Sequence, residues 1–340
     1  MSMKLNDFRF LVAALTGACV LHPAIGGAQI VETLGVRALG MGGAFVAVAD
    51  DASAIFWNPA GLATGGFVSL LTEGGTWEVI PPDGRDGGAM SGFGTVVAFA
   101  VPPVGLGYYR IRASAVTTSA VEAEDRRQLT ELGPAVTSLV THNMAVTLVQ
   151  SLTEGVTAAA TVRFVRGVAA TGPTHTGATR RDELEAVTNF VGRADNSIDL
   201  DVGGMASRGR VRLGIVARNL REPSFDAVPT GRIRLRRQVR AGVAVMPAAD
   251  LSVALDVDMT RTETVTGSRR NVAVGVERWW MARRLGARAG VRANTRGAAR
   301  PVVAGGLSVA ARPSIWVEGQ VTGGAGDADR GWSVGARIGF

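Results

Sequence analysis

The sequence from Gly35 to Ala63 reads Gly-Val-Arg-Ala-Leu-Gly-Met-Gly-Gly-Ala-Phe-Val-Ala-Val-Ala-Asp-Asp-Ala-Ser-Ala-Ile-Phe-Trp-Asn-Pro-Ala-Gly-Leu-Ala. It contains too much glycine and alanine to make a good strand. A carboxylate at Asp50 or Asp51 can accept the free backbone N–H groups at the start of a short helix over 52–56. That helix must end at Asn58, because the residue before a proline is disfavoured in the α conformation. The stretch therefore predicts a compact, irregular segment.

Three glycines in this stretch suit a segment that is threaded through a confined space. Gly40, Gly42 and Gly43 permit positive φ or close backbone approach, and we expect them to let the segment move. The rival interpretation is a dinucleotide-binding loop. It is disfavoured because Phe45 stands where the third glycine of G-x-G-x-x-G belongs and no apolar strand precedes the loop.

The tripeptide Asn58-Pro59-Ala60 matches the Asn-Pro-Ala motif in the amino-terminal hatch of the FadL superfamily of outer-membrane barrels, which this stretch resembles. The longer pattern, Arg-Ala-Leu-Gly-Met-Gly-Gly-Ala before Ala-Asp-Asp-Ala and Trp-Asn-Pro-Ala-Gly-Leu, is more similar to the PorV/PorQ branch. The resemblance implies an all-β fold: a transmembrane antiparallel β-barrel with an N-terminal plug, or hatch, in its lumen. The resemblance covers only the plug.

The first 28 residues have the pattern of a secretory signal peptide. Lys4 and Arg9 form a basic start, 10–21 is an apolar core, and Gly-Gly-Ala before Gln29 is a small-residue cleavage site. The chain's single cysteine, Cys19, lies inside this segment. Lipoprotein processing before Cys19 is disfavoured by the Thr three residues earlier. We therefore expect three parts: signal peptide 1–28, plug 29–65 and barrel 66–340.

Composition favours many short strands over a helix-rich enzyme. Hydrophobic residues make up 46% of the 340 residues, aromatic residues only 6%, and glycine occurs 45 times. The net charge of +7 suggests nucleic acid, but the arginines are spread along the chain, so we expect no nucleic-acid partner. Past the signal, no run of about 18 apolar residues occurs that would form a membrane-spanning helix. A secreted chain can still enter the outer membrane as a closed barrel.

The rest of the chain repeats a strand pattern of about ten residues. We expect about fourteen strands, an even number as in bacterial single-chain barrels. They occupy 66–73, 92–101, 104–114, 136–150, 155–168, 196–206, 208–219, 236–246, 250–260, 270–280, 284–293, 300–310, 313–322 and 331–340.

Alternation within these strands separates an apolar face from a polar one. In the last strand Trp332, Val334, Ala336, Ile338 and Phe340 alternate with Ser333, Gly335, Arg337 and Gly339. Arginine facing lipid costs about 2–4 kcal/mol at mid-bilayer, so the charged faces must line the interior. The expected inward charges are Asp199, Asp201, Asp256, Asp258, Glu277, Glu318, Arg212, Arg240, Arg288 and Arg337, which predicts a charge-paired, wet lumen.

The connections alternate in length. Long links, such as 115–135 and 169–195, alternate with tight ones, such as 102–103 and 151–154. This asymmetry is typical of outer-membrane barrels, which have long outer loops and short periplasmic turns.

The second to fourth strands depart from this regularity. Residues 92–101 are apolar on both faces, and one of these three strands could lean against the plug, where an apolar inner face would be buried. The alternation breaks near Tyr108 and Tyr109, where we expect a β-bulge.

The chain offers little for catalysis. His142 in a strand and His175 in a loop stand apart, and no nucleophile elbow or paired acid is recognisable, so we expect a non-enzyme without cofactor or metal. Residues 182–185 resemble a short solvated helix. Trp279 and Trp280 are expected in a periplasmic aromatic girdle.

Two groups of residues suggest partners. Arginines at the base of an outer loop could bind lipopolysaccharide phosphates, since arginine binds them bidentately; the alternative is a solvated loop base. They are Arg232, Arg234, Arg236 and Arg237, with Arg240 nearby. The terminal Phe340, with Trp332 on the same face, resembles the carboxy-terminal signal that barrel-assembly machinery recognises.

Two functions remain open. The first is FadL-like transport of hydrophobic small molecules, such as fatty acids or hydrocarbons, across the outer membrane. The second is a PorV-like accessory barrel that binds or shuttles secreted or surface proteins. We expect the first function, and the PorV-like role is the alternative. The readable inner faces are polar, and the longer motif is more similar to the second branch.

Overall fold

The computed structural model describes residues 33–80, 88–116, 135–173, 179–187, 192–229, 231–265, 267–296, 301–324 and 329–340. The expected signal peptide 1–28 lies outside these residues. Fourteen strands form the ring of the barrel. They are β1 (Ser69–Val79), β2 (Ala89–Val101), β3 (Val104–Val116), β4 (Ala135–Thr153), β5 (Val156–Pro173), β6 (Arg193–Arg208), β7 (Val211–Arg218), β10 (Gln238–Ala248), β11 (Leu251–Asp258), β14 (Asn271–Trp280), β15 (Leu285–Asn294), β16 (Val302–Arg312), β17 (Ile315–Gly324) and β18 (Asp329–Gly339).

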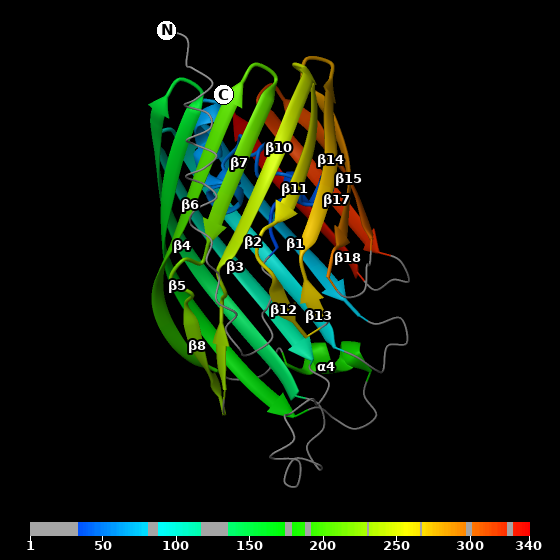
Figure 1. Cartoon of the computed structure of the whole chain (residues 1–340). Coiled ribbons are helices and arrows are strands. Elements are labelled where there is room, and N and C mark those ends of the chain that lie inside the picture. Colours follow the sequence, from blue (N-terminus) through cyan, green and yellow to red (C-terminus); the bar gives the residue numbers. More distant parts are fainter. Residues whose placement is uncertain are drawn as a thin grey trace.

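The ring is closed because its first strand pairs with its last. Leu70 of β1 lies opposite Ile338 of β18 on one side and opposite Phe99 of β2 on the other. All pairings around the ring are antiparallel, which confirms the predicted antiparallel barrel of about fourteen strands (Figure 1). A closed ring leaves no unpaired strand edge.

Every predicted strand overlaps an observed one, and β1 differs most. It was expected over 66–73 but lies at Ser69–Val79, because Gly74 and Gly75 belong to the strand. A Cβ on Gly75 would lie 2.3 Å from the Cβ of Ser333, so the glycine permits close packing against β18.

Four short strands were not predicted. β8 (Ser224–Val228) and β9 (Arg232–Arg234) form a hairpin beside β5, and β12 (Thr262–Thr264) pairs with β13 (Gly267–Arg269). Both hairpins lie within connections that were predicted from the sequence as long loops without strands.

The expected bulge at Tyr108 and Tyr109 is wrong. β3 pairs with β2 and with β4 in unbroken register through both residues. Tyr109 is buried inside the ring, whereas Tyr108 is exposed outside it. The apparent break arose because Arg110 and Arg112 are polar residues on the outer face.

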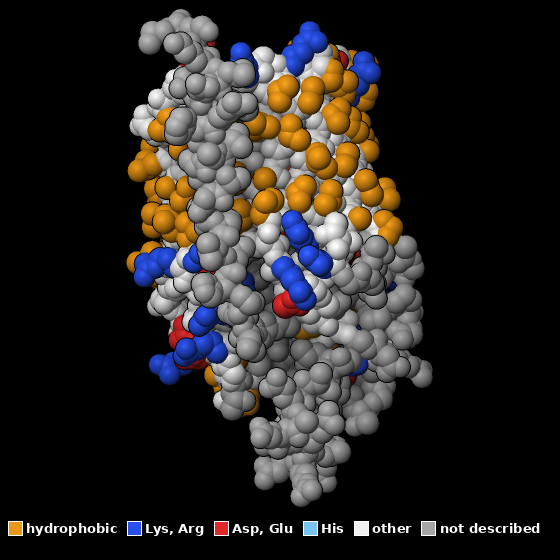
Figure 2. All heavy atoms as spheres, viewed as in Figure 1, with side chains coloured by type: hydrophobic (Ala, Val, Ile, Leu, Met, Phe, Trp, Pro, Cys, Tyr) orange, Lys and Arg blue, Asp and Glu red, His pale blue; other side chains and the backbone are white. Residues whose placement is uncertain are grey.

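The outer face of the ring is apolar. Exposed side chains on successive outward positions include Leu106, Met144, Val146, Leu148 and Val162. Figure 2 shows such side chains as a band on the visible wall, between basic side chains at one rim and charged side chains further down. Among the described residues, no helix is both long and apolar enough to cross a bilayer.

The two ends of the barrel differ. Short turns, such as those at 102–103, 154–155, 209–210 and 313–314, gather at one end, which is uppermost in Figure 1. Helix α4 (Arg180–Ala186) and the described hairpins β8–β9 and β12–β13, which belong to longer connections, lie at the other end. This confirms the predicted alternation of connection lengths.

Helix α4 begins with a capping box formed by Thr179 and Asp182. The Thr179 hydroxyl donates to the Asp182 carboxylate at 2.8 Å, and this hydrogen bond lowers the pKa of Asp182. The helix predicted at 182–185 is therefore present, but it is not fully solvated. Leu184 is buried with Val116 and Val136, which lie on β3 and β4.

Candidate functional site

A folded segment occupies the inside of the ring on its short-turn side. It contains α2 (Val36–Gly40), α3 (Ala54–Trp57) and the 3-10 helix η1 (Pro59–Thr64). α2 contacts β15 to β18, whereas η1 contacts β4 to β6, so the segment reaches across the lumen. Figure 1 shows it in dark blue between the strands. We call residues 33–65 the internal segment.

The helix expected over 52–56 is displaced to Ala54–Trp57. Asp51 does not cap it directly; its Oδ1 accepts from the backbone N–H of Ser53 at 2.9 Å. The backbone N–H of Ala52 donates instead to Ser69 Oγ of β1 at 2.9 Å. The predicted end is correct, since Asn58 is extended and α3 stops at Trp57.

One buried arginine gathers three carboxylates. Arg37 of α2 contacts Asp50 at 2.7 Å and Asp51 at 2.5 Å, both in the internal segment, and Glu277 of β14 at 2.7 Å. Its side chain is only 3% exposed. The cluster therefore connects two parts of the internal segment to the wall. Removing the arginine or one of its carboxylate partners would leave a buried charge unpaired.

Two wall carboxylates hold the backbone of the internal segment. Asp256 of β11 accepts the N–H groups of Phe45 and Val46, each at 2.8 Å. Glu73 of β1 accepts the N–H of Val36 at 2.9 Å. These hydrogen bonds satisfy backbone donors that have no partner in a helix or strand.

The Asn-Pro-Ala motif fastens the other end of the internal segment. The Asn58 amide donates to the carbonyls of Val46 at 2.9 Å and Gly204 of β6 at 3.2 Å, while its Oδ1 accepts the N–H of Ala60. Pro59 begins η1, and a Cβ on Gly203 would lie 2.8 Å from the proline ring. The Ala60 carbonyl accepts from Thr157 Oγ1 at 3.2 Å.

The three glycines singled out in the sequence serve different needs. Gly42 and Gly43 have φ of +68° and +92° at the end of α2. Gly40 has ordinary φ, but a Cβ there would meet the Arg288 side chain at 2.8 Å. Close approach and positive φ are both observed; whether the segment moves stays a prediction.

The apolar inner face predicted for 92–101 packs on the internal segment. Val96, Ala98 and Ala100 of β2 share a buried cluster with Ile55 and Phe56. This explains why β2 is apolar on both faces: the outer face meets the surroundings of the barrel and the inner face meets the segment.

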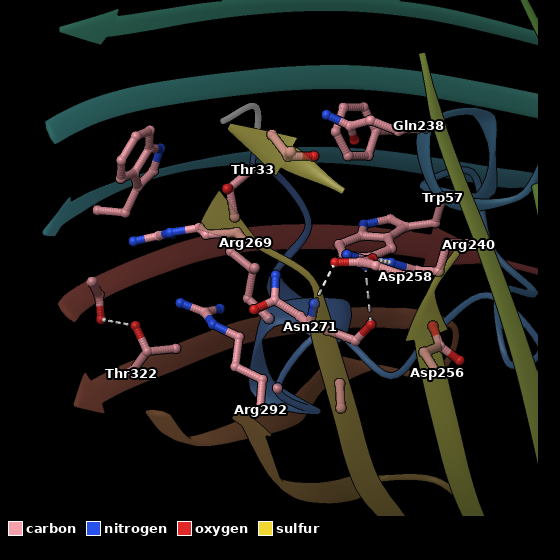
Figure 3. Close-up of a pocket in the computed structure, with 18 of the residues that line it drawn as sticks. Thr33, Trp57, Gln238, Arg240, Asp256, Asp258, Arg269, Asn271, Arg292 and Thr322 are labelled. Carbon is pink, nitrogen blue, oxygen red and sulfur yellow. Dashed lines mark hydrogen bonds and ion pairs between the residues drawn. The ribbon is translucent and has the colours of Figure 1, made fainter. Parts of the chain in front are cut away.

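A cavity of about 130 Å³ lies between the internal segment and the long-connection end. The segment contributes Leu39, Gly43, Phe56 and Trp57, and the wall contributes polar and charged side chains. Figure 3 shows Arg240, Asp258 and Asn271 converging near Trp57. The cavity thus has an aromatic floor and charged walls.

Ion pairs fix the charged wall of this cavity. Arg240 binds Asp258 at 2.6 Å, and Arg292 binds Asp329 at 3.0 Å. The guanidinium of Arg240 lies 5.5 Å from the Trp57 ring centre, and that of Arg218 lies 3.7 Å from the Phe56 ring centre. Cations over aromatic faces are a favourable arrangement.

The predicted charge-paired interior is confirmed, but part of it is not wet. Arg288 lies 3.6 Å from Glu277 and 3.8 Å from Glu318, and the three are nearly inaccessible to solvent. Water is displaced there because the internal segment fills this half of the lumen.

Sequence reasoning missed two central arginines. Arg163 of β5 is fully buried and contacts Asp199, Asp201 at 2.9 Å, and the Tyr109 hydroxyl at 3.0 Å. Its inward position follows from the alternation of β5. Arg37 is the single cation in an apolar stretch that also carries two aspartates, and this signal could have revealed it.

The arginines proposed for lipopolysaccharide are largely engaged within the protein. Arg232 pairs with Asp226 at 2.7 Å, and Arg234 pairs with Glu222 at 3.8 Å. The Asp226 pKa is lowered by this hydrogen bond from Arg232. Arg237 donates to the Leu220 carbonyl at 3.2 Å, and the Arg236 carbonyl accepts from Asn219. Lipopolysaccharide contact at these residues stays a prediction.

The two tryptophans at the end of β14 separate. Trp280 is exposed outside the ring, but Trp279 is buried. Trp279 packs edge-on against Trp316, with the Arg337 guanidinium 5.8 Å from its ring centre. The expectation of a girdle is therefore wrong for Trp279, because consecutive strand residues face opposite sides.

Other predicted residues lie apart. Trp332 and Phe340 are both exposed on the outer side of the last strand and its end. His142 hydrogen-bonds to the Tyr108 hydroxyl at 2.8 Å on the outer wall, and His175 lies outside the described residues. No group of three metal-ligating side chains occurs in the part of the chain that the structure describes.

The closed ring, the internal segment and the luminal cavity define a fourteen-stranded β-barrel that encloses a folded segment. The chain belongs to the family described as "F plasmid transfer operon, TraF, protein", whose sequence profile matches residues 83–258. No curated protein sequence matches the chain.

Solved structures share the fold at low identity. The CymD monoaromatic hydrocarbon channel is 14% identical, with a TM-score of 0.64, over 92% of this chain and 98% of that one. The Ralstonia pickettii toluene transporter TbuX is 13% identical, with a TM-score of 0.61, over 90% and 98%. A Pseudomonas aeruginosa FadL homologue is 11% identical, with a TM-score of 0.64, over 92% and 100%.

Proposed function

We propose that this protein is an outer-membrane channel for hydrophobic small molecules, in which residues 29–65 form the plug and residues 66–340 the barrel. Residues 1–28 would direct export. The observation that carries the proposal is a closed ring with an apolar outer face around a folded segment and a cavity. Proteins of similar fold include a monoaromatic hydrocarbon channel and a toluene transporter, which supports this solute class.

The outer wall supports placement in a bilayer. Side chains such as Leu148, at 61% exposed, and Met144, at 59%, would be costly to leave in water over such an area. A closed ring satisfies all strand backbone groups internally, as hydrocarbon surroundings require. The short-turn end would then face the periplasm.

The cavity supports the capture of a small solute. Its volume of about 130 Å³ is similar to the roughly 150 Å³ of an apolar protein cavity that holds benzene. Trp57 and Leu39 offer apolar contact, whereas Arg240 and Asp258 face the same space. This lining favours a compact solute with one polar end over a long alkyl chain.

The internal segment would act as the gate. It blocks the lumen through bonds that can be broken singly: the Arg37 cluster, the Asp256 carboxylate and the Asn58 amide. Gly42 and Gly43 lie between the first two anchors and would take up the backbone rotation.

The proposal is tested in two steps. Purified mature protein should need detergent, and its folded form should migrate differently on a gel before and after boiling. A protein that stays dissolved without detergent contradicts the proposal.

In reconstituted liposomes, Asp256→Ala should increase passage of a labelled monoaromatic solute over wild type, because two anchoring bonds are lost. The matched control is Asp250→Ala, an exposed carboxylate at a short turn.

Cells separate this function from an accessory role in secretion. Deletion of the gene should reduce solute uptake and leave secreted proteins unchanged. Loss of secreted proteins with normal uptake would contradict the proposal.

A further inference from the structure

Two arginines and the histidine between them stand side by side on the outer wall. Arg110 of β3 lies opposite His142 of β4, and His142 lies opposite Arg166 of β5. All three occupy outward positions of their strands, where inward neighbours such as Ile111 and Val165 are buried. Directly opposite residues on adjacent strands have Cβ atoms about 5 Å apart, so the three side chains form one continuous row.

The neighbouring row of outward side chains consists of one methionine and two aromatic residues. Tyr108, Met144 and Phe164 lie opposite one another, two residues closer to the short turns, and are 40%, 59% and 42% exposed. The basic row therefore borders the apolar wall directly. The Tyr108 hydroxyl joins the two rows by its hydrogen bond to His142.

Strand geometry puts the basic row at the edge of the apolar band. From the turn at 154–155 to His142 and Arg166, β4 and β5 rise by roughly 30 Å, at about 3.3 Å per residue and a tilt of about 40°. The apolar band of such barrels is about 25 Å tall. The row thus lies at the outer interface, where arginine costs only about 0–1 kcal/mol.

The row has no acidic partner among the described residues. Neither Arg110 nor Arg166 forms an ion pair with a described carboxylate, in contrast to Arg232 and Arg234. Arg112 lies two residues beyond Arg110 on the same face and lines a groove of about 670 Å³ on the outer wall. Phe93 and Trp332 lie in that groove, so apolar and basic surfaces meet there as well. Its two carboxylates are Glu185 and Glu78, and Glu78 pairs with Arg181 and Arg330.

We propose that Arg110, Arg112, His142 and Arg166 bind the phosphates of lipopolysaccharide, with its acyl chains lying on the Tyr108–Met144–Phe164 row. The proposal rests on the outer-membrane location proposed above. Arginine binds phosphate bidentately, and adjacent cations without a carboxylate attract a multiply charged anion. A lipid that combines phosphates with acyl chains matches both rows at once.

The test measures binding of fluorescent lipopolysaccharide to the purified, detergent-folded full chain. Arg110→Gln with Arg166→Gln should weaken binding by at least about tenfold, since two charge-assisted contacts are lost. Arg208→Gln with Arg210→Gln removes the same charge at the opposite, short-turn end and should leave binding unchanged. Lipid A without phosphates should bind weakly, and equally to the wild type and to the first variant.

Three outcomes overturn the proposal: equal loss in both double variants, loss only on changing Arg232 and Arg234, or full binding of dephosphorylated lipid A. Gel migration before and after boiling verifies that each variant is folded. Failure of the wild type to insert into liposomes would refute the membrane location and this site together. Normal lipopolysaccharide binding without solute uptake would refute the channel function and leave this site standing.

Discussion

At the residue scale, Gly42 and Gly43 differ in what surrounds them, although both have positive φ. A Cβ on Gly42 would lie 2.9 Å from the backbone nitrogen of Val291, whereas the nearest atoms to a Cβ on Gly43 are 3.9 Å away. Left-handed backbone costs an ordinary residue about 1–2 kcal/mol. Gly42→Ala must in addition displace β15 or the internal segment.

We therefore expect Gly42→Ala to loosen the internal segment more than Gly43→Ala. The measurement is the rate at which proteinase K removes the segment from the folded barrel in detergent. Gly43→Ala should show the backbone cost alone. Equal rates in the two variants would mean that wall contact at Gly42 is unimportant.

Arg37 stabilises the internal segment through its charge, whereas Gly42 does so through its small size. Arg37→Met leaves Asp50, Asp51 and Glu277 without their shared cation. Removing one partner of a buried ion pair costs about 3–5 kcal/mol. We expect the segment to become accessible to proteinase K while the barrel still migrates as folded.

A compensating variant separates charge from packing in this cluster. Arg37→Met combined with Asp51→Asn and Glu277→Gln should recover part of the protection, since fewer charges stay buried. If the triple variant is no better protected than Arg37→Met, lost packing and not unpaired charge explains the defect.

At the scale of elements, the seam between β1 and β18 closes the barrel. β18 pairs with β17 through Ile315↔Ile338 and with β1 through Ser69↔Gly339. Trp332 and Phe340 point outward and bury little against the rest of the described protein. Their apolar character is therefore better explained by a partner or by lipid than by packing.

We predict that Trp332→Ser with Phe340→Ser lowers the folded fraction in cells several-fold but barely changes refolding from urea into detergent. The measurement is the ratio of folded to unfolded bands on an unheated gel. Val321→Ser, also exposed and on the neighbouring strand, is the control. A defect of equal size in cells and in detergent would indicate a folding role without recognition by assembly machinery.

At the scale of the whole molecule, the proposed bilayer makes the effect of a charge depend on depth. Val146 is 49% exposed on the outer wall of β4, with Leu106 and Val162 opposite it. Val146→Arg should cost about 2–4 kcal/mol of unfolding free energy in liposomes. Gln150→Arg, on the same face of β4 but nearer the short turn, should cost about 0–1 kcal/mol.

Guanidinium unfolding of the two variants in liposomes is the measurement. In detergent micelles without a fixed bilayer, the difference between them should shrink. If Val146→Arg is as stable as Gln150→Arg in liposomes, that part of the wall is not at mid-bilayer, and the proposed orientation is wrong.

The prediction from sequence succeeded where a local pattern has one physical meaning. The alternation in β18 and the alternating lengths of the connections predicted the barrel. The alternation shows directly which face of each strand is apolar. It failed where the pattern had two meanings: Arg110 looked like an irregularity in β3 and is an outward residue in regular register. The similarity to the PorV/PorQ branch stays a resemblance of one short stretch.

The amino-acid sequence alone determined the number of strands in the ring, the inward charges and the end of α3 before Pro59, because these follow from the period of two and from local backbone sterics. Only the tertiary structure decided that Arg37 unites three carboxylates and that Arg163 joins residues of β3, β5 and β6. Such partners are far apart in the chain, and closing the ring around the internal segment is what brings them together.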